Sequence, residues 1–435
     1  MISARDVKRM AVVAAMVLLA AGPAQAEAPY TIEWARQLGT SVGDCSYSGA
    51  VDASGNAYIS GYTQGNLGGT NAGGGTDAFL TKYDGSGNVL WSRQLGSAGG
   101  DDSYSVALDA TGNAFISGHT GGNLGGTNAG SYDAFLAKYD GSGNHLWSRQ
   151  LGTSVLDSSD SAAVDAFGNA YIAGWTQGSL GGTNAGGTDA FLAKYDGSGN
   201  LLWSRQLGTS TNDYSHAVAV DASGGVYISG YTSGDAFLAK YDGSGNPLWF
   251  QQIGTSSSDQ SNSVAVDASG NIYISGSTQG NLGGTNAGGA DAFLAKYDGL
   301  GTLLWSRQIG TVSDDRSYSV GVDASGNAYI SGYTQGSLGG TNAGDWDAFL
   351  AKYDGSGNLL WSQQIGTASR DSSYSVGVDA SGNIYISGST QGSLGGTKAG
   401  GYDAFLVKLT PEPATLSLLA AGLGAVWMRK RRGTS

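Results

Sequence analysis

The chain has 435 residues, of which 75 are glycine, only 5 are proline and 13% are charged. A collagen-like chain would need glycine at every third position with abundant proline, and a disordered acidic chain would lack the 10% of aromatic residues found here. The formal net charge of −13 disfavours nucleic-acid binding, because an acidic protein repels polyanions. The composition therefore predicts a folded protein that does not bind nucleic acid.

The first 26 residues have the three parts of a cleavable secretory signal. Basic residues precede an apolar stretch over residues 10–21, and Ala24 and Ala26 supply the small side chains that a signal peptidase requires. We therefore predict a signal peptide over residues 1–26, cleavage after Ala26 and export to the cell envelope, the cell surface or the outside of the cell.

Residues 27–410 contain one unit repeated seven times. Tryptophan recurs at intervals of 57, 56, 56, 46, 56 and 56 residues, at Trp34, Trp91, Trp147, Trp203, Trp249, Trp305 and Trp361. The tetrapeptide DAFL recurs in register with it, beginning at Asp77, Asp133, Asp189, Asp235, Asp291, Asp347 and Asp403. Each unit reads as SYSVAVD, NAYISGYT, DAFLAKYD and NLLWSRQLG, four β-rich runs separated by turn residues. Four strands per unit predict an all-β, seven-bladed β-propeller with four antiparallel strands in each blade.

The order of the runs also predicts how the ring closes. The repeat region starts with TIEWARQLG, a fourth-strand sequence, and ends with DAFLVKL, a third-strand sequence. Residues 30–38 should therefore pair with residues 403–409 and complete the last blade, which hides two strand edges. Within the blades, DASGN and DGSGN have the residues of tight hairpin turns. The recurring tryptophan and phenylalanine residues are predicted to lie in the core.

The units YSVAVDASGNAYISGYT and DAFLAKYDGSGNLLWSRQLG resemble the SBBP family, the seven-bladed β-propeller repeat of bacterial secreted proteins, over residues 30–409. This resemblance implies the fold and says almost nothing about activity. The run YDGSGNLLW also resembles the repeat of quinoprotein propellers. Those enzymes need a quinone pocket, and no constellation of suitable non-repeated residues is apparent in the sequence.

The sequence contains no motif that we assign to an enzyme. Residues 39–43 match the G-x-S-x-G pattern around Ser41, but a nucleophile elbow requires a helix after the serine, and another strand is predicted there. His119, His145 and His216 occupy different positions of different repeats, so each is expected to be a packed or solvated strand residue. No catalytic residue is assigned, and no cofactor is expected apart from a calcium ion.

A ring of aspartates is the candidate site for a ligand or for calcium. One aspartate of each unit stands eight residues before the aspartate that ends the first-strand run, and the seven would surround the mouth of a central channel if the first strands line it: Asp44, Asp101, Asp157, Asp213, Asp259, Asp315 and Asp371. The alternative is structural, with each carboxylate holding the preceding loop by hydrogen bonds. The long insert TQGNLGGTNAGG lies on the same face in six blades and is missing from the fourth. Any specific ligand is expected on this face.

Residues 411–435 resemble the PEP-CTERM sorting signal of Gram-negative bacteria. The signal consists here of Pro411-Glu412-Pro413, an apolar run over residues 414–428 that predicts a transmembrane helix, and the basic tail Arg429, Lys430, Arg431 and Arg432. The resemblance implies an exosortase-type processing enzyme as partner, transient anchoring in the inner membrane, and association with extracellular polysaccharide and biofilm.

The sequence therefore predicts a non-enzymatic, exported surface or matrix protein with a binding or structural role. The alternative is a propeller enzyme, a hydrolase or lyase acting on polysaccharide, which would need a pair of carboxylates in one funnel; a quinoprotein is a further alternative. Near-identity of the repeats argues against an enzyme, because catalysis requires a unique set of residues whereas a structural or multivalent role leaves the copies interchangeable.

Overall fold

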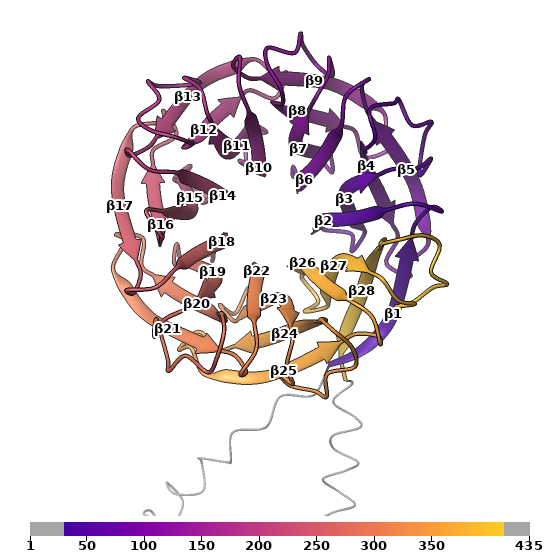
Figure 1. The fold of residues 1–435 in the computed structure, drawn as a ribbon, viewed down its shortest axis with the longest axis vertical. Helices are drawn as coiled ribbons and strands as arrows, with labels where there is room; N and C mark the ends of the chain where they lie inside the picture. Colours follow the sequence, from indigo (N-terminus) through magenta and orange to yellow (C-terminus); the bar gives the residue numbers. More distant parts are fainter. Residues whose placement is uncertain (1–29, 413–435) are drawn as a thin grey trace, which may run out of the picture. The chain divides into compact units, whose positions relative to one another are not determined.

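A computed structural model describes residues 30–412. These residues form seven four-stranded antiparallel sheets arranged around a central channel (Figure 1), so the predicted seven-bladed propeller is confirmed. The predicted signal peptide and all of the predicted sorting segment beyond Glu412 lie outside the described residues. No helix among residues 30–412 is long and apolar enough to cross a membrane.

The blades follow one another along the chain, and each begins with its innermost strand. Blade one has β2 (Asp44–Val51), β3 (Ala57–Thr63), β4 (Asp77–Tyr83) and β5 (Val89–Leu95). Blade two has β6 (Asp101–Leu108), β7 (Ala114–Thr120), β8 (Asp133–Tyr139) and β9 (His145–Leu151). Blade three has β10 (Asp157–Val164), β11 (Ala170–Thr176), β12 (Asp189–Tyr195) and β13 (Leu201–Leu207). Blade four has β14 (Asp213–Val220), β15 (Val226–Thr232), β16 (Asp235–Tyr241) and β17 (Pro247–Ile253).

The last three blades repeat this pattern. Blade five has β18 (Asp259–Val266), β19 (Ile272–Thr278), β20 (Asp291–Tyr297) and β21 (Leu303–Ile309). Blade six has β22 (Asp315–Val322), β23 (Ala328–Thr334), β24 (Asp347–Tyr353) and β25 (Leu359–Ile365). Blade seven has β26 (Asp371–Val378), β27 (Ile384–Thr390) and β28 (Asp403–Pro411), and its outermost strand is β1 (Tyr30–Leu38).

Strand β1 closes the ring as predicted, since the sheet order of blade seven is β1-β28-β27-β26. Side chains reinforce the closure: Gln37 Nε2 donates a hydrogen bond of 2.7 Å to Asp403 Oδ2, and Gln37 Oε1 accepts one of 2.9 Å from Leu394 N. A strand from the start of the repeat region therefore completes the sheet formed at its end, and no blade is left with three strands.

The hydrophobic core lies between adjacent blades rather than in one central mass. Alternation along β3 and β4 sends Ile59 and Phe79 toward blade seven and Tyr58 and Leu80 toward blade two, and each set belongs to a separate buried cluster. The repeated phenylalanines of the DAFL segments are fully buried, as predicted. Each blade thus buries both faces of its middle strands against its two neighbours.

The repeated tryptophans meet the prediction that they belong to the core only in part. They lie on the outermost strands, where Trp34 is buried in the cluster between blades seven and one and the other six are half-buried. The ring of Trp34 packs on Gly87 of the next blade, and its Nε1 donates a hydrogen bond of 3.1 Å to Gly85 O. The Arg36 guanidinium lies 5.3 Å from the centre of the Trp34 ring and donates to Gly87 O at 2.8 Å. These residues clamp the outer turn of the neighbouring blade, and an indole needs a polar partner there.

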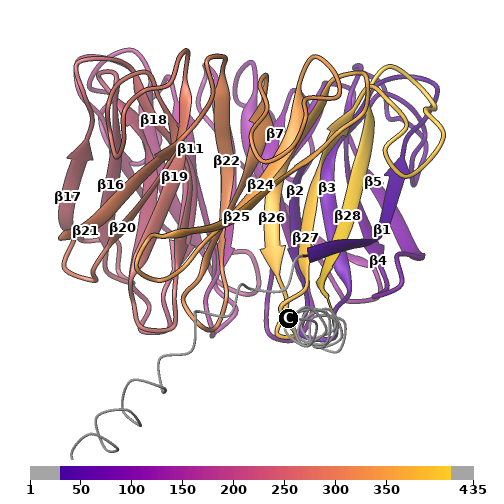
Figure 2. The same ribbon diagram turned by 90° about the horizontal axis from the view of Figure 1, so that it is seen from below.

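The hairpin turns form as predicted. Asp52 Oδ1 accepts hydrogen bonds of 2.9 Å from Ser54 N and Asn56 N, which is an Asx-turn. Lys82 passes between two blades, with its Nζ 3.6 Å from Asp52 Oδ2 and 3.3 Å from Gly141 O. The aspartates of these turns are therefore engaged in local structure. In Figure 2 the connections between strands lie on two opposite faces of the propeller.

Candidate functional site

The innermost strands β2, β6, β10, β14, β18, β22 and β26 line the central channel (Figure 1), as expected for the first strand of each unit. A cavity of about 540 Å³ lies among them, and all seven blades contribute residues to it. The residues come from the first five positions of the innermost strands and from the ends of β7 and β11, together with Tyr132 just before β8 and Leu156 just before β10. This end of the channel is the face that carries the long inserts, because Thr63 and Asp77 flank one insert and Asp44 pairs with Thr63.

A β-bulge determines which side chains face the cavity. In each innermost strand the register with its neighbour shifts at the fourth residue, and in β2 this residue is Tyr47, which has no partner opposite. The neighbouring strand has a glycine beside the bulge, Gly61, where a Cβ would lie only 1.8 Å from Cys45 O. Glycine is therefore required for the backbones to approach, and the bulge turns the fourth residue toward the channel.

Four of the seven bulge residues are tyrosines, and they form a continuous arc across blades six, seven, one and two. The ring centres of Tyr47 and Tyr104 are 5.2 Å apart, those of Tyr47 and Tyr374 are 5.4 Å apart, and those of Tyr318 and Tyr374 are 5.2 Å apart. Burial raises the pKa of each phenol, that of Tyr318 to about 12. The tyrosines therefore present neutral hydroxyl groups and aromatic faces.

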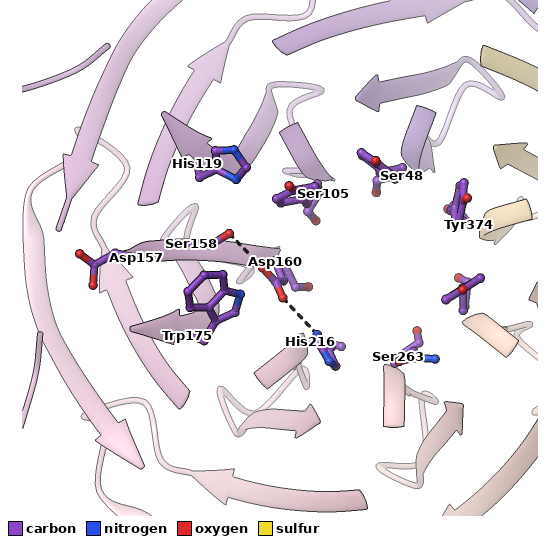
Figure 3. Close-up of a pocket in the computed structure, with 18 of the residues that line it drawn as sticks. Ser48, Ser105, His119, Asp157, Ser158, Asp160, Trp175, His216, Ser263 and Tyr374 are labelled. Atoms are coloured by element: carbon purple, nitrogen blue, oxygen red, sulfur yellow. Dashed lines mark hydrogen bonds and ion pairs between the residues drawn. The ribbon is translucent and has the colours of Figure 1, made fainter. Parts of the chain in front are cut away.

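The other three bulge residues form a polar arc across blades three, four and five: Asp160, His216 and Asn262. Asp160 Oδ2 lies 3.1 Å from His216 Nδ1, and Ser158 Oγ donates a hydrogen bond of 3.1 Å to Asp160 Oδ1 (Figure 3). Asn262 Nδ2 donates to Ser317 O at 2.9 Å, which leaves its carbonyl oxygen for other contacts. The polar arc thus offers a carboxylate, an imidazole and an amide within one cavity.

A second group of side chains surrounds the bulge residues. His119 packs edge-on against Tyr132, with ring centres 4.5 Å apart, and its Nε2 lies 3.8 Å from Asp102 Oδ2. Burial lowers the pKa of His119. Trp175 lies at the cavity wall beside blade four, where its ring centre is 5.8 Å from that of Tyr214. Aromatic surface is therefore available on both arcs.

Two of the three histidines thus reach the cavity, although each is also a packed strand residue, as expected. His119 and His216 come from different strands of different blades, and ring closure brings both to the channel. His145 is not among the residues that line the cavity; it lies on the outermost strand β9, where its Nε2 is 2.6 Å from Ser148 Oγ. Ser41 lies in an exposed loop that leads into strand β2, so the helix of a nucleophile elbow is missing.

The predicted ring of aspartates lies at the start of the innermost strands, and every carboxylate is buried. Each accepts a hydrogen bond of 2.6 Å from the backbone N–H four residues earlier and another from the hydroxyl of that same residue. Burial raises the pKa of five of them: Asp44, Asp101, Asp157, Asp315 and Asp371.

The structure therefore shows these aspartates holding the loop that precedes each blade, which is the structural alternative considered for them. Of the seven, only Asp157 contributes to the lining of the cavity. Within residues 30–412, no group of three or more histidine, cysteine, aspartate or glutamate residues is arranged to hold a metal ion. Binding of a ligand or of calcium by the ring stays a prediction.

Asp160 and Asn262 were not identified from the sequence, and no role was assigned to His216. A signal was present, since the fourth position of the first strand reads Tyr, Tyr, Asp, His, Asn, Tyr and Tyr through repeats that are otherwise nearly identical. Comparing the repeats position by position would have identified this variable position. The comparison would not have shown that the position faces a cavity, because a bulge breaks the simple alternation of side chains along a strand.

Comparisons with known proteins agree with this fold. The family described as a beta-propeller repeat, SBBP, matches residues 33–68, 90–125, 146–181, 202–237, 248–283, 304–340 and 360–395. These stretches cover more than half of the chain, which therefore belongs to the beta-propeller repeat family.

Individual relatives are more distant. The regulatory protein FlaEY of Caulobacter vibrioides is 29% identical over 204 residues, which are 45% of this chain and 18% of that protein. The chain thus matches less than a fifth of the length of this relative. A crystal structure of puromycin hydrolase has a TM-score of 0.50 at 11% identity and covers 84% of this chain and 54% of its own. A Lactobacillus plantarum protein has a TM-score of 0.47 at 14% identity, with 77% and 90% covered. At 11% identity, the likeness to puromycin hydrolase shows the fold alone.

Proposed function

We propose that this protein is a non-enzymatic carbohydrate-binding propeller that takes a sugar unit of an extracellular polysaccharide into the cavity at the long-insert end of its channel. One observation carries the proposal: seven nearly identical repeats differ at the bulge position, and there they divide into an arc of four tyrosines and an arc of Asp160, His216 and Asn262.

The chemistry of the two arcs suits a sugar ring. Aromatic faces pack against the apolar C–H face of a pyranose, and a carboxylate and an amide carbonyl accept hydrogen bonds from its hydroxyl groups. The volume of about 540 Å³ lies within the range of small-molecule pockets, so the cavity holds one or two sugar units. Neutral tyrosine hydroxyl groups can donate as well as accept, which matches the mixed character of a polyol.

The alternative of a polysaccharide-acting enzyme receives less support. Glycoside hydrolysis ordinarily needs two carboxylates, one on each side of the scissile bond. Asp157 and Asp160 are the acidic residues among those lining the cavity, and Asp157 is fully buried with its oxygens facing Thr153 and Thr176. Asp160 is thus left as the single accessible carboxylate of the cavity, which fits recognition better than acid–base catalysis.

A binding experiment tests the proposal. Purified protein is screened on a glycan array, and the best saccharides are measured by calorimetry against Asp160→Asn and against Asn262→Ala. We expect each substitution to weaken binding at least tenfold, which corresponds to about 1.4 kcal/mol or more. His145→Gln on the outer strand β9 is the matched control and should bind like the wild type. Binding that is unchanged in both cavity variants would contradict the proposal, and release of shortened saccharide by the wild type would favour the enzyme.

Export and sorting complete the proposed role. The signal over residues 1–26 and the tail that starts at Pro411 would deliver the propeller to the cell surface or matrix, with an exosortase-type enzyme as processing partner. Mass spectrometry of secreted protein tests this: we expect a species that begins near Glu27 and has lost Arg429, Lys430, Arg431 and Arg432. Recovery of the intact basic tail outside the cell would contradict processing.

A further inference from the structure

Blade four differs from the other six in the connection between its second and third strands. That connection has only two residues, Ser233 and Gly234, between β15 and β16, whereas the inserts of the other blades run from residues such as 64 to 76 or 279 to 290. The inserts fold over the outer strands of their own blades, where for example Gln94 Oε1 accepts a hydrogen bond of 2.9 Å from Leu67 N. The rim formed by these inserts is therefore interrupted at blade four, on the left in Figure 1.

The interruption lies next to a group of aromatic side chains. Tyr214 and Tyr231 stack with ring centres 4.9 Å apart, Trp175 lies 5.8 Å from Tyr214, and the His216 ring lies 5.6 Å from Tyr231. Among the second residues of the seven innermost strands, Tyr214 alone is aromatic; the others are Cys45, Asp102, Ser158, Gln260, Arg316 and Ser372. Aromatic rings thus lead from the short turn of blade four to the polar arc.

In two other blades the corresponding ring is covered by the end of the insert. Tyr132 packs on His119 and Trp346 stacks on Tyr333, with ring centres 4.5 Å apart in both pairs. The residue at this position in blade four is Gly234, which has no side chain to cover Tyr231. Tyr231 is half-buried, whereas Tyr333 under Trp346 is buried. Exposed hydroxyl groups continue outward from the rings, with Thr211 Oγ1 2.9 Å from Ser233 Oγ.

Three differences between repeats therefore coincide at one blade. Blade four lacks the insert, it carries the additional tyrosine, and it is the middle of the three blades that supply the polar arc. A ligand confined to the cavity would need neither the missing insert nor the additional tyrosine. A polymer whose end enters the cavity needs a path outward, and stacked aromatic rings and hydroxyl groups are the surface on which successive sugar units pack.

We propose that the cavity recognises the end of a polysaccharide chain and that the following sugar units leave the channel over blade four, along Tyr214, Tyr231 and Trp175. This inference rests on the proposed carbohydrate-binding function and makes it specific for chain ends. Linear oligosaccharides should then bind more tightly than the single sugar, because they add contacts along the path, and cyclic oligosaccharides should not bind because they have no end.

The test measures affinity as a function of chain length. The probes are linear glucan, mannan, galactan and uronic-acid oligosaccharides of one to six units, together with cyclic glucans, used in solution by calorimetry. In one variant Ser233-Gly234 is replaced by the sequence of residues 279–290, which restores the insert. In a second variant Tyr214→Ser and Tyr231→Ser are combined, since serine already occupies these positions in blade seven as Ser372 and Ser389.

For the wild type we expect the hexasaccharide of the recognised sugar to bind at least tenfold more tightly than the monosaccharide. Both variants should lose that gain while binding the monosaccharide within twofold of the wild type. Tyr62→Ser, at the position of blade one that corresponds to Tyr231, is the matched control and should retain the gain. Melting temperatures of all variants show that they are folded.

The outcomes separate the two proposals. If oligosaccharide affinity persists in both variants while Asp160→Asn abolishes monosaccharide binding, the path over blade four is wrong and the binding function stands. Binding of cyclic glucans as tightly as linear ones would also overturn recognition of chain ends. If no saccharide of any length binds the wild type, the inference fails together with the proposed function.

Discussion

The innermost strand of each blade carries an aspartate at its first residue and a bulged residue at its fourth, and the two positions contrast sharply. The aspartates are identical in all seven blades, buried, and hydrogen-bonded to the preceding loop. The bulged residues vary between blades and lie at the cavity. In a repeat protein, identity between copies therefore marks the scaffold, because every blade has the same structural requirement. Differences between otherwise equal copies mark the site, because a single ligand breaks the symmetry.

The largest effect is expected from the scaffold as a whole. Deleting residues 30–38 removes β1, exposes the edge of β28 and removes the bonds from Gln37 to Asp403. We expect a fall in melting temperature of at least 10 °C or aggregation, measured by calorimetry and light scattering. A control variant keeps a strand at this place: residues 32–38 are replaced by the sequence of the equivalent outer strand, residues 303–309. This variant should retain most of the stability that the deletion loses. An unchanged melting temperature in the deletion would contradict closure by β1.

A scaffold aspartate comes next. Asp101→Ala leaves Ser97 N and Ser97 Oγ without their buried acceptor, so we expect a loss of about 2 to 3 kcal/mol in the free energy of unfolding, measured with urea. Saccharide affinity of the folded protein should stay within twofold of the wild type. Asp101→Asn, which retains one acceptor oxygen, should lose less stability. If calcium stabilises the wild type but not Asp101→Ala, the aspartate ring binds a cation and the contrast with the bulge position weakens.

The opposite result is expected at the bulge position. His216→Tyr places in blade four the residue found in four other blades, and it removes the 3.1 Å contact with Asp160. We expect saccharide binding to fall at least tenfold in calorimetry, with a melting temperature within about 2 °C of the wild type because surface substitutions usually cost little stability. A large fall in melting temperature without loss of binding would show that the bulge residues belong to the scaffold.

The pH dependence of stability should separate the scaffold aspartates from those of the hairpin turns. Hydrogen bonds from the side chain and backbone of the following asparagine lower the pKa of Asp84, Asp140, Asp196 and Asp242. Stability from these groups is present above the unfolded pKa of about 3.9 and is lost as the pH falls through the lower folded value. Burial raises the pKa of Asp101 and Asp157 in the folded protein, so their contribution changes in the opposite direction and is most favourable at acid pH.

Substituting the four hairpin aspartates by asparagine should therefore reduce the loss of melting temperature between pH 5 and pH 3. Substituting Asp101 and Asp157 by asparagine should increase that loss, because the variant no longer gains stability by protonation. Melting curves over this pH range measure both changes. Equal pH profiles in the two variants would show that the two sets of aspartates are not distinct.

The smallest effect is expected outside both positions. Ser41 is exposed in the loop between β1 and β2, so Ser41→Ala should change stability by no more than about 0.5 kcal/mol and leave saccharide affinity unchanged. Loss of a hydrolase activity in this variant would contradict the assignment of the G-x-S-x-G match as accidental.

The fold was accessible from the sequence because its determinants are local. Alternating apolar residues, hairpin turns such as Asp52–Asn56 and the phase of residues 30–38 identify strands, blades and closure without reference to distant contacts. The prediction for the tryptophans held only in part, for the opposite reason. Trp34 is buried but the six others are half-buried, because the surroundings of such a ring depend on a turn that another blade supplies, as the turn at Gly85 and Gly87 does for Trp34.

The site depended on tertiary structure in two respects. A bulge beside Gly61 and its equivalents directs the fourth residue of each strand inward, and a sequence of alternating residues does not reveal where the alternation breaks. Asp160 and His216 are 56 residues apart in the chain and 3.1 Å apart in space, a contact that exists only because neighbouring blades lie side by side in a closed ring. By itself the sequence determined the number of blades, their strands and the closure, since these follow from short-range patterns repeated seven times. Tertiary structure alone decided which residues meet in the channel, because convergence of seven distant positions is a property of the ring and not of any one repeat.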